Sequence, residues 1–459
     1  MTFPEAQRYL DSFINLELQP ILKKDASSFN LDRMRRLLAF LGDPHKNLQI
    51  IHVAGSKGKG STCALTAGIL SKAGYKTGLY TSPHLSDCRE RIRIMDTAGS
   101  HNKTSDVFPD TVSENDLCAV IHEAKPGIEA MRLERKWGRL SFFEVYTALA
   151  LYYFHKKRAD WVVLETGLGG RLDATNAVSS IVCALTPISL EHTAVLGDTA
   201  AQIAREKAGI IKSPRQKVVI APQPQEARDV FRRRCARYSI RPLWVGEDIR
   251  WESAAQTLEY QTIHIHGTRE DYPDLKLSLL GKYQALNAAV AVGIVESLQD
   301  LGCRIPSRAV YDGLKEAFWP GRLEVMGTDP VVVLDGAHNQ ASAFHLVESL
   351  REIFPERDVT LVLGVCQDKD REGICRELNK ITQTVVTTMA DHPRAYQFSE
   401  GELDIFFPGK SRVFTSRVGQ AVEYACRSGK ETSLVLITGS FFVVSEARRI
   451  LSACTPFQA

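Results

Sequence analysis

Residues 50–62 read IIHVAGSKGKGST and decide the expected fold of the chain. Four of the first five residues are apolar, which predicts a buried strand, and three glycines follow within the next six residues. A helical run over residues 62–73 comes directly afterwards. A strand that turns through glycines into a helix is typical of a phosphate-binding loop, because backbone N–H groups and the helix dipole converge on the anion.

The loop departs from the common spacing Gly-x-x-x-x-Gly-Lys-Ser/Thr. Val53 stands where the first glycine is expected, and Gly60 separates Lys59 from Ser61. A variant loop still fits, in which Lys59 reaches the β- and γ-phosphates and Ser61 or Thr62 offers a hydroxyl to Mg²⁺. The alternative is a glycine-rich turn with a solvated lysine, and the flanking strand and helix argue against it.

The composition is that of a globular protein with more than one core. A chain of 459 residues predicts two or three domains. The net charge of +3, with no basic run interleaved with aromatic residues, indicates no nucleic-acid partner. Ten cysteines without a Cys-x-x-Cys pair indicate neither a zinc site nor a disulfide framework. Without a secretion signal or an apolar run of about 18 residues, we expect a cytoplasmic protein with no membrane partner.

Short apolar runs alternate with helical runs after the phosphate loop. The expected strands are residues 76–80, 161–167, 181–187 and 217–221. Helices between them, such as residues 142–155, predict a parallel sheet covered on both faces. Residues 4–42 are expected to be helical and residues 96–115 to form an exposed loop, whereas residues 245–280 alternate in the antiparallel style.

A second α/β pattern follows a turn at residues 320–324. Its expected strands are residues 331–334, 359–365, 384–389 and 434–438. We therefore expect an α/β fold with a domain boundary near residue 320. Several of these strands end in Asp, His, Gly or Ser, and such sheets hold ligands at the carboxyl ends of their strands.

Three side chains are candidates for a metal site near the loop. Ser61, Glu144 and His192 would supply a hydroxyl, a carboxylate and an imidazole to Mg²⁺, although imidazole is an unusual ligand for so hard an ion. Taken singly, Glu144 is more often a solvated or paired carboxylate, and His192 is more often a hydrogen-bonded histidine.

Other candidates have equally plain alternatives. From the residues alone, Lys207 is compatible with a surface helix lysine. Asp335 precedes His338 by three residues just past a buried strand, and helix capping explains Asp335 equally well. His264 and His266 share one strand face, and without a third partner we interpret both as solvent-facing.

Four segments carry a resemblance to a known family. They read AGSKGKGS (residues 54–61), TSPHL (81–85), ETGLGGRLDATN (165–176) and DGAHN (335–339). In this order they closely resemble the folylpolyglutamate synthase and dihydrofolate synthase family, a Mur-ligase type of ATP-dependent amide-forming enzyme. The resemblance extends from about residue 9 to residue 446. It implies an N-terminal ATPase domain with a phosphate-loop parallel sheet (residues 1–320) and a C-terminal Rossmann-like α/β domain (residues 321–459).

The resemblance implies ATP and Mg²⁺ as cofactors. Lys59 would hold the γ-phosphate, Ser61 and Glu144 would bind one Mg²⁺ that Ser82 also touches, and His192 would bind a second. Lys207 matches a lysine that is carbamylated in such ligases, which would turn it into an anionic Mg²⁺ ligand. The implied nucleotide-binding residues are Gly55, Ser56, Lys57, Gly58, Lys59, Gly60, Ser61, Thr62, Asn287, Arg322 and Asp335.

The implied catalytic residues come from both domains. They are Lys59, Lys207, Arg322, Asp335 and His338. Arg322 would contact phosphate at the hinge, Asp335 and His338 would face ATP and the incoming glutamate, and Ser440 would border the glutamate site. Ser56-Lys57 and Glu191 replace the Thr-Asn and Asp that are common in bacterial members, which leaves the tuning of the metal site open.

The implied reaction is amide formation through an acyl phosphate. ATP would phosphorylate a carboxylate of dihydropteroate or of a reduced folate, and L-glutamate would then displace phosphate, in a monomeric enzyme. A Mur-type cell-wall ligase is one alternative, but only about 48 residues precede the first strand, with no evident UDP-binding domain. A nucleotide- or folate-binding regulator without activity is another, and the candidate ligands argue against it.

Overall fold

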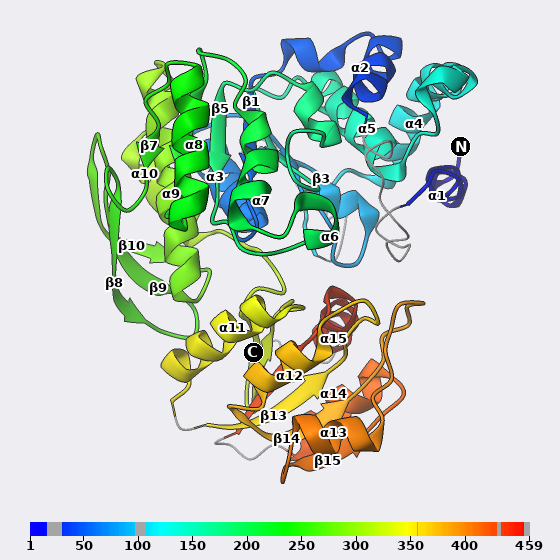
Figure 1. Cartoon of the computed structure of the whole chain (residues 1–459), viewed down its shortest axis with the longest axis vertical. Coiled ribbons are helices and arrows are strands. Elements are labelled where there is room, and N and C mark those ends of the chain that lie inside the picture. Colours follow the sequence, from blue (N-terminus) through cyan, green and yellow to red (C-terminus); the bar gives the residue numbers. More distant parts are fainter. Residues whose placement is uncertain (16–29, 97–106, 356, 429–432, 454–459) are drawn as a thin grey trace. The chain divides into compact units, whose positions relative to one another are not determined.

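The computed structural model describes residues 1–15, 30–96, 107–355, 357–428 and 433–453. These residues form two compact units (Figure 1). Unit 1 comprises Met1–Ala254, Thr262–Leu277 and Tyr283–Ala317, and unit 2 comprises Ala255–Gln261, Ser278–Lys282 and Phe318–Ala459. Each unit is built around a sheet of its own, as the two α/β patterns predict.

Unit 1 contains a seven-stranded sheet with the order β3-β2-β4-β1-β5-β6-β7. Its strands are β1 (Ile50–Ala54), β2 (Thr77–Tyr80), β3 (Ile92–Met95), β4 (Trp161–Glu165), β5 (Val182–Leu185), β6 (Lys217–Ile220) and β7 (Leu243–Trp244). All neighbours pair in parallel except β2 and β3. The strand β1 is buried along its whole length between β4 and β5, so the loop that follows it lies at the middle of the sheet edge.

Helices cover both faces of this sheet. They are α1 (Phe3–Asp11), α2 (Leu31–Phe40), α3 (Lys59–Lys72), α4 (Glu114–Leu133), α5 (Phe142–Lys156), α6 (Thr193–Leu196), α7 (Ala200–Lys207), α8 (Gln225–Arg237), α9 (Lys282–Asp300) and α10 (Ser307–Lys315). Val218 and Ile220 of β6 belong to the core under α7 and α8, whereas Val219 between them contacts α9 at Gly293. Because successive side chains of a strand point to opposite faces, this alternation places α9 on the face away from α7 and α8.

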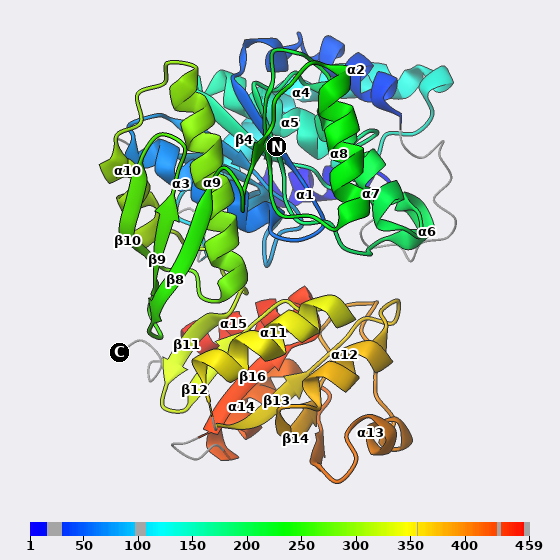
Figure 2. The same cartoon turned by 60° about the vertical axis from the view of Figure 1, so that its left-hand side comes forward.

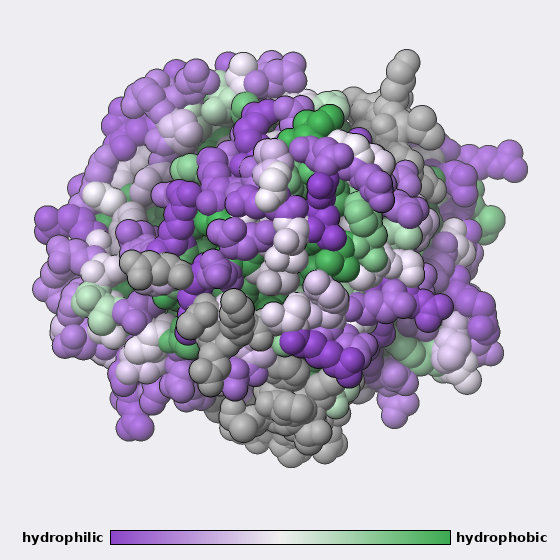
Figure 3. Space-filling model, turned by 90° about the horizontal axis from the view of Figure 1, so that it is seen from below, coloured by the Kyte–Doolittle hydropathy of each residue, from purple (hydrophilic) through white to green (hydrophobic). Residues whose placement is uncertain are grey.

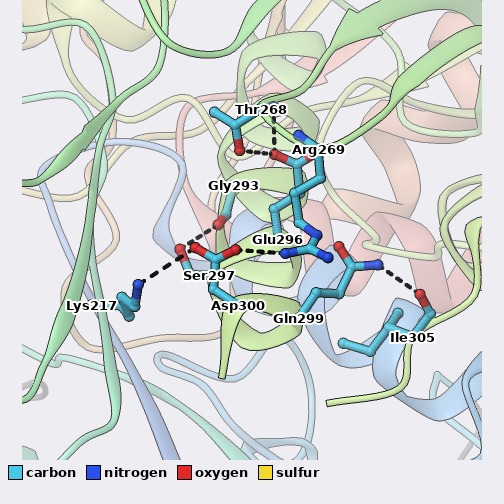
Figure 4. Close-up of polar contacts among 9 residues, drawn as sticks. All are labelled: Lys217, Thr268, Arg269, Gly293, Glu296, Ser297, Gln299, Asp300 and Ile305. Atoms are coloured by element: carbon cyan, nitrogen blue, oxygen red, sulfur yellow. Dashed lines mark hydrogen bonds and ion pairs between the residues drawn. The ribbon is translucent and has the colours of Figure 1, made fainter. Parts of the chain in front are cut away.

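A three-stranded sheet of order β10-β9-β8 lies beside α9 and α10 (Figure 2). Its strands are β8 (Arg250–Gln256), β9 (Gln261–His266) and β10 (Asp271–Leu277). The buried carboxylate of Glu296 on α9 accepts hydrogen bonds from Thr268 N (2.7 Å) and Thr268 Oγ1 (2.7 Å), and Arg269 forms an ion pair with Asp300 (2.8 Å; Figure 4). These contacts attach the β9–β10 turn to α9, the helix that carries Asn287.

Unit 2 is a second α/β sheet with the order β11-β12-β16-β13-β14-β15. Its elements are β11 (Glu324–Thr328), β12 (Val331–Leu334), α11 (Gln340–Ile353), β13 (Asp358–Leu363), α12 (Arg371–Leu378), β14 (Thr382–Thr387), α13 (Glu400–Phe406), β15 (Ser411–Phe414), α14 (Val418–Ser428), β16 (Ser433–Thr438) and α15 (Phe441–Ala453). Only the edge strand β11 is antiparallel to its neighbour. The last strand, β16, is inserted between β12 and β13, so Ser440 follows the strand next to the one that precedes Asp335.

The parallel sheets confirm the predicted α/β class. Part of the expected helical stretch at residues 4–42 and half of the expected loop at residues 96–115 lie outside the described residues. The described end of that loop is not all irregular, because α4 already begins at Glu114 and Thr111 bridges to Arg93.

The surface is mixed in polarity. Figure 3 shows one face of the molecule, on which apolar residues are visible between hydrophilic ones. The exposed large apolar side chains come from separate elements and include Leu133, Leu190, Leu301, Ile405 and Phe414. Scattered residues of this kind are ordinary on a globular protein. Within the described ranges, no helix has both the length and the apolarity required to cross a membrane.

Candidate active site

The phosphate loop is held by the chain that leaves β5. Ser56 N and Lys57 N both donate to the carbonyl of Pro187 (3.0 and 3.2 Å), and Ser56 Oγ donates to the carbonyl of Ser189 (3.0 Å). A Cβ on Gly55 would lie 1.8 Å from Thr186 Oγ1, so only glycine fits at this crossing. The backbone of the loop is therefore held by residues 186–189, which are distant from it in sequence.

Gly58 places the start of α3 against α9. Its φ of 82° lies in the left-handed region, and a Cβ there would lie 2.2 Å from Oδ1 of Asn287. The amide of Asn287 is oriented by a hydrogen bond from its Nδ2 to Gln284 Oε1 (2.9 Å). The structure thus brings Asn287 to the loop, although the two lie about 230 residues apart. Lys59 starts the helix directly after Gly58, followed by Gly60 and the buried Ser61 and Thr62.

Lys207 is buried beneath the loop, so the interpretation of a surface lysine is wrong. The residue is 1 % exposed, and its Nζ donates to the carbonyl of Gly55 (2.6 Å) and to Oε1 of Glu191 (2.9 Å). Burial lowers the pKa of Lys207 to about 8, because Glu191 only partly offsets the loss of solvation and the charge of Lys59 adds to it. Lys59 and Lys207 therefore lie close enough, although they come from different elements, for the charge of one to affect the other.

The negative charge of Glu191 interacts favourably with the positive charges of both Lys207 and Lys59. Burial by itself would raise the pKa of its carboxyl, but the charges of Lys207 and Lys59 lower that pKa to about 2. The next residue, His192, is exposed and has a left-handed φ of 46° at the start of α6. The Asp-to-Glu difference noted in the sequence therefore falls on the ion-pair partner of Lys207.

Glu165 is a residue that the sequence analysis quoted without giving it a role. It is the last residue of β4, lies opposite Val53 of β1, and is 4 % exposed. Its Oε2 accepts a hydrogen bond from Ser82 N (3.0 Å), and its charge contributes to the raised pKa of Cys63 on α3. The signal that would have found it is its position at the carboxyl end of a strand.

Glu144, one of the expected metal ligands, is held by partners from two segments of unit 1. It lies in the first turn of α5, where its Oε1 accepts from Arg33 Nε (2.7 Å) and its Oε2 accepts from Ser141 N and Oγ (both 2.8 Å). These contacts form a capping box and a buried ion pair. In the structure Glu144 is therefore the ion-pair partner of Arg33 and part of the cap of α5.

The segment at residues 165–176 packs against the end of α7. Arg171 N donates to the carbonyl of Glu206 (2.7 Å), and a Cβ on Gly170 would lie 3.0 Å from Cα of Lys207. Asp173 closes the segment on itself by accepting from Leu168 N (2.8 Å) and Thr175 N (3.0 Å). The segment therefore forms part of the wall that buries Lys207.

A second group of candidate residues lies at the carboxyl edge of the unit 2 sheet. We call it the Arg322 cluster, and it consists of Arg322, Asp335, His338 and Ser440. Asp335 accepts hydrogen bonds from Leu323 N (3.0 Å) and Ala337 N (2.9 Å), and Leu323 has a left-handed φ of 46°. Asp335 thus fixes the backbone next to Arg322. The Arg322 guanidinium lies 4.6 Å from the centre of the Phe441 ring.

His338 and Ser440 lie at the same edge. Nδ1 of His338 is 2.8 Å from the carbonyl of Gly336, and a carbonyl only accepts, so Nδ1 carries the proton of the neutral ring. Ser440 is 4 % exposed, and its Oγ accepts from Val443 N (3.2 Å) at the start of α15. The remaining histidine pair, His264 and His266, is partly exposed, and each contacts β10 residues instead of a common ligand.

The oxygen donors around the loop suit a magnesium ion. Within the described residues, no group of three or more His, Cys, Asp or Glu side chains is arranged to hold a metal. The hydroxyls of Ser61 and Ser82 and the carboxylate of Glu165 are oxygen donors, the kind that Mg²⁺ prefers, and the ion usually completes its shell with water and phosphate. A site of one carboxylate and hydroxyls therefore fits Mg²⁺ better than a transition metal.

Comparisons with known proteins relate the chain to the Mur ligases. Residues 141–295 match the Mur ligase middle domain, and residues 321–441 match the Mur ligase glutamate ligase domain. Among solved structures, the Mycobacterium tuberculosis folylpolyglutamate synthase complexed with ADP has a TM-score of 0.84 at 29 % identity, with 98 % of each chain covered. Escherichia coli FolC in complex with DHPP and ADP has a TM-score of 0.81 at 27 % identity, covering 99 % of this chain and 98 % of that one.

Curated relatives match over the same length. The dihydrofolate synthase/folylpolyglutamate synthase of Bacillus subtilis is 32 % identical, over 92 % of this chain and 94 % of its own. A probable bifunctional folylpolyglutamate synthase/dihydropteroate synthase of Haloferax volcanii is 35 % identical over 98 % of this chain, which spans about half (50 %) of that relative. Because the similarity to the Bacillus protein covers nearly the whole of both chains, this chain belongs to the folylpolyglutamate synthase and dihydrofolate synthase family of Mur-type ligases.

Proposed function

We propose that this ATP-dependent ligase joins the amine of L-glutamate to a carboxylate of dihydropteroate or of a reduced folate. The observation that carries the proposal is the phosphate loop, at which Lys59, Lys207 and Glu165 lie together. The chain also belongs to a family of ligases. The first step is attack of a substrate carboxylate oxygen on the γ-phosphorus of ATP, which breaks the bond to ADP and gives an acyl phosphate. The glutamate nitrogen then attacks the carbonyl carbon, loses a proton and expels phosphate.

The charged residues of both units serve these steps. Phosphorylation is needed because an unactivated carboxylate would have to expel oxide. Lys59 and Arg322 stabilise the negative charge of the transferring phosphoryl group. Nε2 of His338 is the acceptor nitrogen of the neutral ring, which suits it to orient the attacking amine. Asp335 is a positioning residue for the backbone of Arg322 and Leu323.

The metal ligands that we propose differ from the first expectation in one residue. Ser61, Glu165 and Ser82 would hold Mg²⁺, with His192 at a second ion, and Glu144 is replaced by Glu165. Bound Mg²⁺ would neutralise charge on the ATP phosphates. Conversion of Glu165→Gln should raise the Mg²⁺ concentration needed for half-maximal turnover, whereas Glu144→Gln should mainly lower the unfolding temperature.

We further propose that Lys207 becomes carbamylated. Carbamate formation requires the uncharged amine, and a pKa of about 8 leaves far more of this form near neutral pH than an ordinary lysine has. The carbamate would make Lys207 an anion beside the loop. Labelling with ¹³C-bicarbonate should give one carbamate signal that disappears on acidification and in Lys207→Arg; an unlabelled wild-type protein would contradict this.

The domain roles, the assembly state and the location are also proposals. Residues 1–320 would be the ATPase domain with the folate site, and residues 321–459 the glutamate-binding domain. The two matched Mur ligase domains, which fall on either side of that boundary, support this. We propose a cytoplasmic monomer, and light scattering at working concentration tests the assembly state.

The test of the function is glutamate-dependent phosphate release from ATP, with dihydropteroate and tetrahydrofolate offered separately. Release with both acceptors would indicate a bifunctional enzyme, and release with one names the activity. Release only with a UDP-linked muramyl substrate would support a cell-wall ligase instead. ATP or folate binding without any release would support a regulator.

A further inference from the structure

The ring of Phe441 contacts both Arg322 and His338, the two side chains of unit 2 to which we assign roles in the reaction. Its centre lies 4.6 Å from the Arg322 guanidinium carbon and 5.5 Å from the centre of the His338 ring. The ring also packs closely against the backbone of Gly336, because a Cβ on that residue would lie 2.4 Å from Phe441 Cε1. One side chain from α15 therefore contacts three points of a segment that is about 100 residues away in sequence.

The position of this ring is itself fixed by main-chain contacts. Phe441 is the first residue of α15, directly after Gly439 and Ser440 at the end of β16. Gly439 N donates to the carbonyl of Ala337 (3.1 Å), which ties the β16–α15 junction to the loop that carries His338. The ring thus comes from a rigid strand-to-helix turn and not from a long flexible arm.

The Phe441 ring is the contact of Arg322 that the structure shows for its guanidinium. The Arg322 guanidinium forms no hydrogen bond or ion pair with any residue in the described part of the chain, and the Phe441 ring is the contact that orients it. A cation over an aromatic face is held in place without using its N–H donors. All five donors are therefore left for an anion.

We propose that Phe441 is a positioning residue that sets the Arg322 guanidinium and the His338 imidazole relative to each other. The proposal rests on the proposed function for the roles of those two residues. It adds that the phosphate-facing cation and the amine-facing imidazole are not placed independently. Displacing the ring would impair the use of ATP and the use of glutamate together.

The neighbouring residue offers a matched control. Phe442 is also half-buried in the first turn of α15, but its ring stacks on His392 at 3.6 Å between centres. Phe441→Leu and Phe442→Leu remove the same atoms from the same helix turn. Phe441→Tyr keeps the ring and should restore what leucine loses.

The experiment is a double-mutant cycle between Phe441→Leu and Arg322→Ala. It reads kcat/KM for ATP and for glutamate, and the Kd of a non-hydrolysable ATP analogue. Phe441→Leu should lower both kcat/KM values about tenfold, with Phe442→Leu and Phe441→Tyr within about threefold of wild type. In the Arg322→Ala background, Phe441→Leu should weaken analogue binding less than twofold, because the group that it positions for ATP is absent.

Two results would overturn the inference. Equal losses in Phe441→Leu and Phe442→Leu, at matched unfolding temperatures, would mean that the ring only packs. Undiminished loss of analogue binding in the Arg322→Ala background would mean that Phe441 does not act through Arg322. If wild type releases no phosphate with glutamate and either acceptor, the proposed function fails, but analogue binding still decides the Arg322 part of the inference separately.

Discussion

The phosphate loop of unit 1 and the Arg322 cluster of unit 2 hold a cation at a sheet edge by different means. In unit 1, Lys207 is buried, and the partly buried carboxylate of Glu191 compensates its charge. In unit 2, Arg322 is half-buried and rests on the face of Phe441. The ion pair fixes both charge and position in a site with little solvent, whereas the ring fixes position and leaves the charge available. The difference suits the proposed roles, in which the loop keeps its shape and Arg322 contacts phosphate.

The largest effect is expected from Lys59→Ala, which removes the unit 1 cation that we propose to bind phosphate. Turnover should fall on the order of a thousandfold, because a positive charge preorganised at the transferring phosphoryl group is lost. Steady-state phosphate release measures it. Lys72→Ala, at the exposed end of the same helix and paired with Glu316, should leave turnover within about twofold of wild type. Comparable turnover in the two variants would remove Lys59 from the mechanism.

Glu191→Gln tests whether the ion pair between Glu191 and Lys207 stabilises unit 1. Breaking such a pair leaves Lys207 buried and uncompensated, which should cost about 3 kcal/mol of unfolding free energy. Urea denaturation at pH 7.5 measures this. Glu206→Gln, which alters a more exposed pair with Arg171, is the matched control and should change stability by less than about 1 kcal/mol. A Glu191→Gln protein as stable as the control would show that Lys207 is not held by charge.

The same pair predicts a pH dependence with a definite sign. The pKa of Glu191 falls from 4.5 to about 2 on folding, so its stabilisation is present above pH 4.5 and is lost as the pH falls through about 2. The pKa of Lys207 falls from 10.5 to about 8, so stability should rise between about pH 8 and 10.5. Thermal unfolding across both windows should lose the acidic dependence in Glu191→Gln. An unchanged acidic slope in that variant would assign it to other carboxylates.

Gly58→Ala tests whether the loop of unit 1 requires its close contact with α9. Both the left-handed φ of 82° and the 2.2 Å approach to Asn287 oppose a Cβ. ATP-analogue binding should weaken about tenfold. Gly409→Ala in unit 2 has a similar φ of 70° with nothing within 4 Å, so it isolates the backbone cost from the contact. Analogue binding by Gly58→Ala as tight as that of the wild type would show that the loop does not require this contact.

The smallest effect concerns Asp335→Asn. One of the two backbone N–H groups at Leu323 and Ala337 would lose its acceptor, which should lower stability by about 1–2 kcal/mol and raise the KM for ATP through the backbone next to Arg322. Asp370→Asn alters an exposed cap of α12 and should cost less, with no change in KM. Equal KM values in the two variants would refute a positioning role for Asp335.

Sequence alone was sufficient for everything that is local or recorded in contiguous motifs. The phosphate loop, the alternation of strands and helices, the α/β class and the family all follow from short segments. The reason is that glycine spacing and hydrophobic period act over a few residues. Lys207 and Glu165 were also present in quoted motifs, but nothing in their neighbours along the chain told whether they were buried.

Only the tertiary structure decided which distant side chains meet. The sequence analysis gave Glu144 a metal-binding role and gave Glu165 none, whereas the strand order brings Glu165 next to the phosphate-loop strand, because β4 pairs with β1 while the first turn of α5 contacts Arg33. Likewise, β16 enters the sheet beside β12 after more than 90 residues, which brings Phe441 to Arg322. Strand order depends on the packing of whole elements, and no local pattern of residues encodes it.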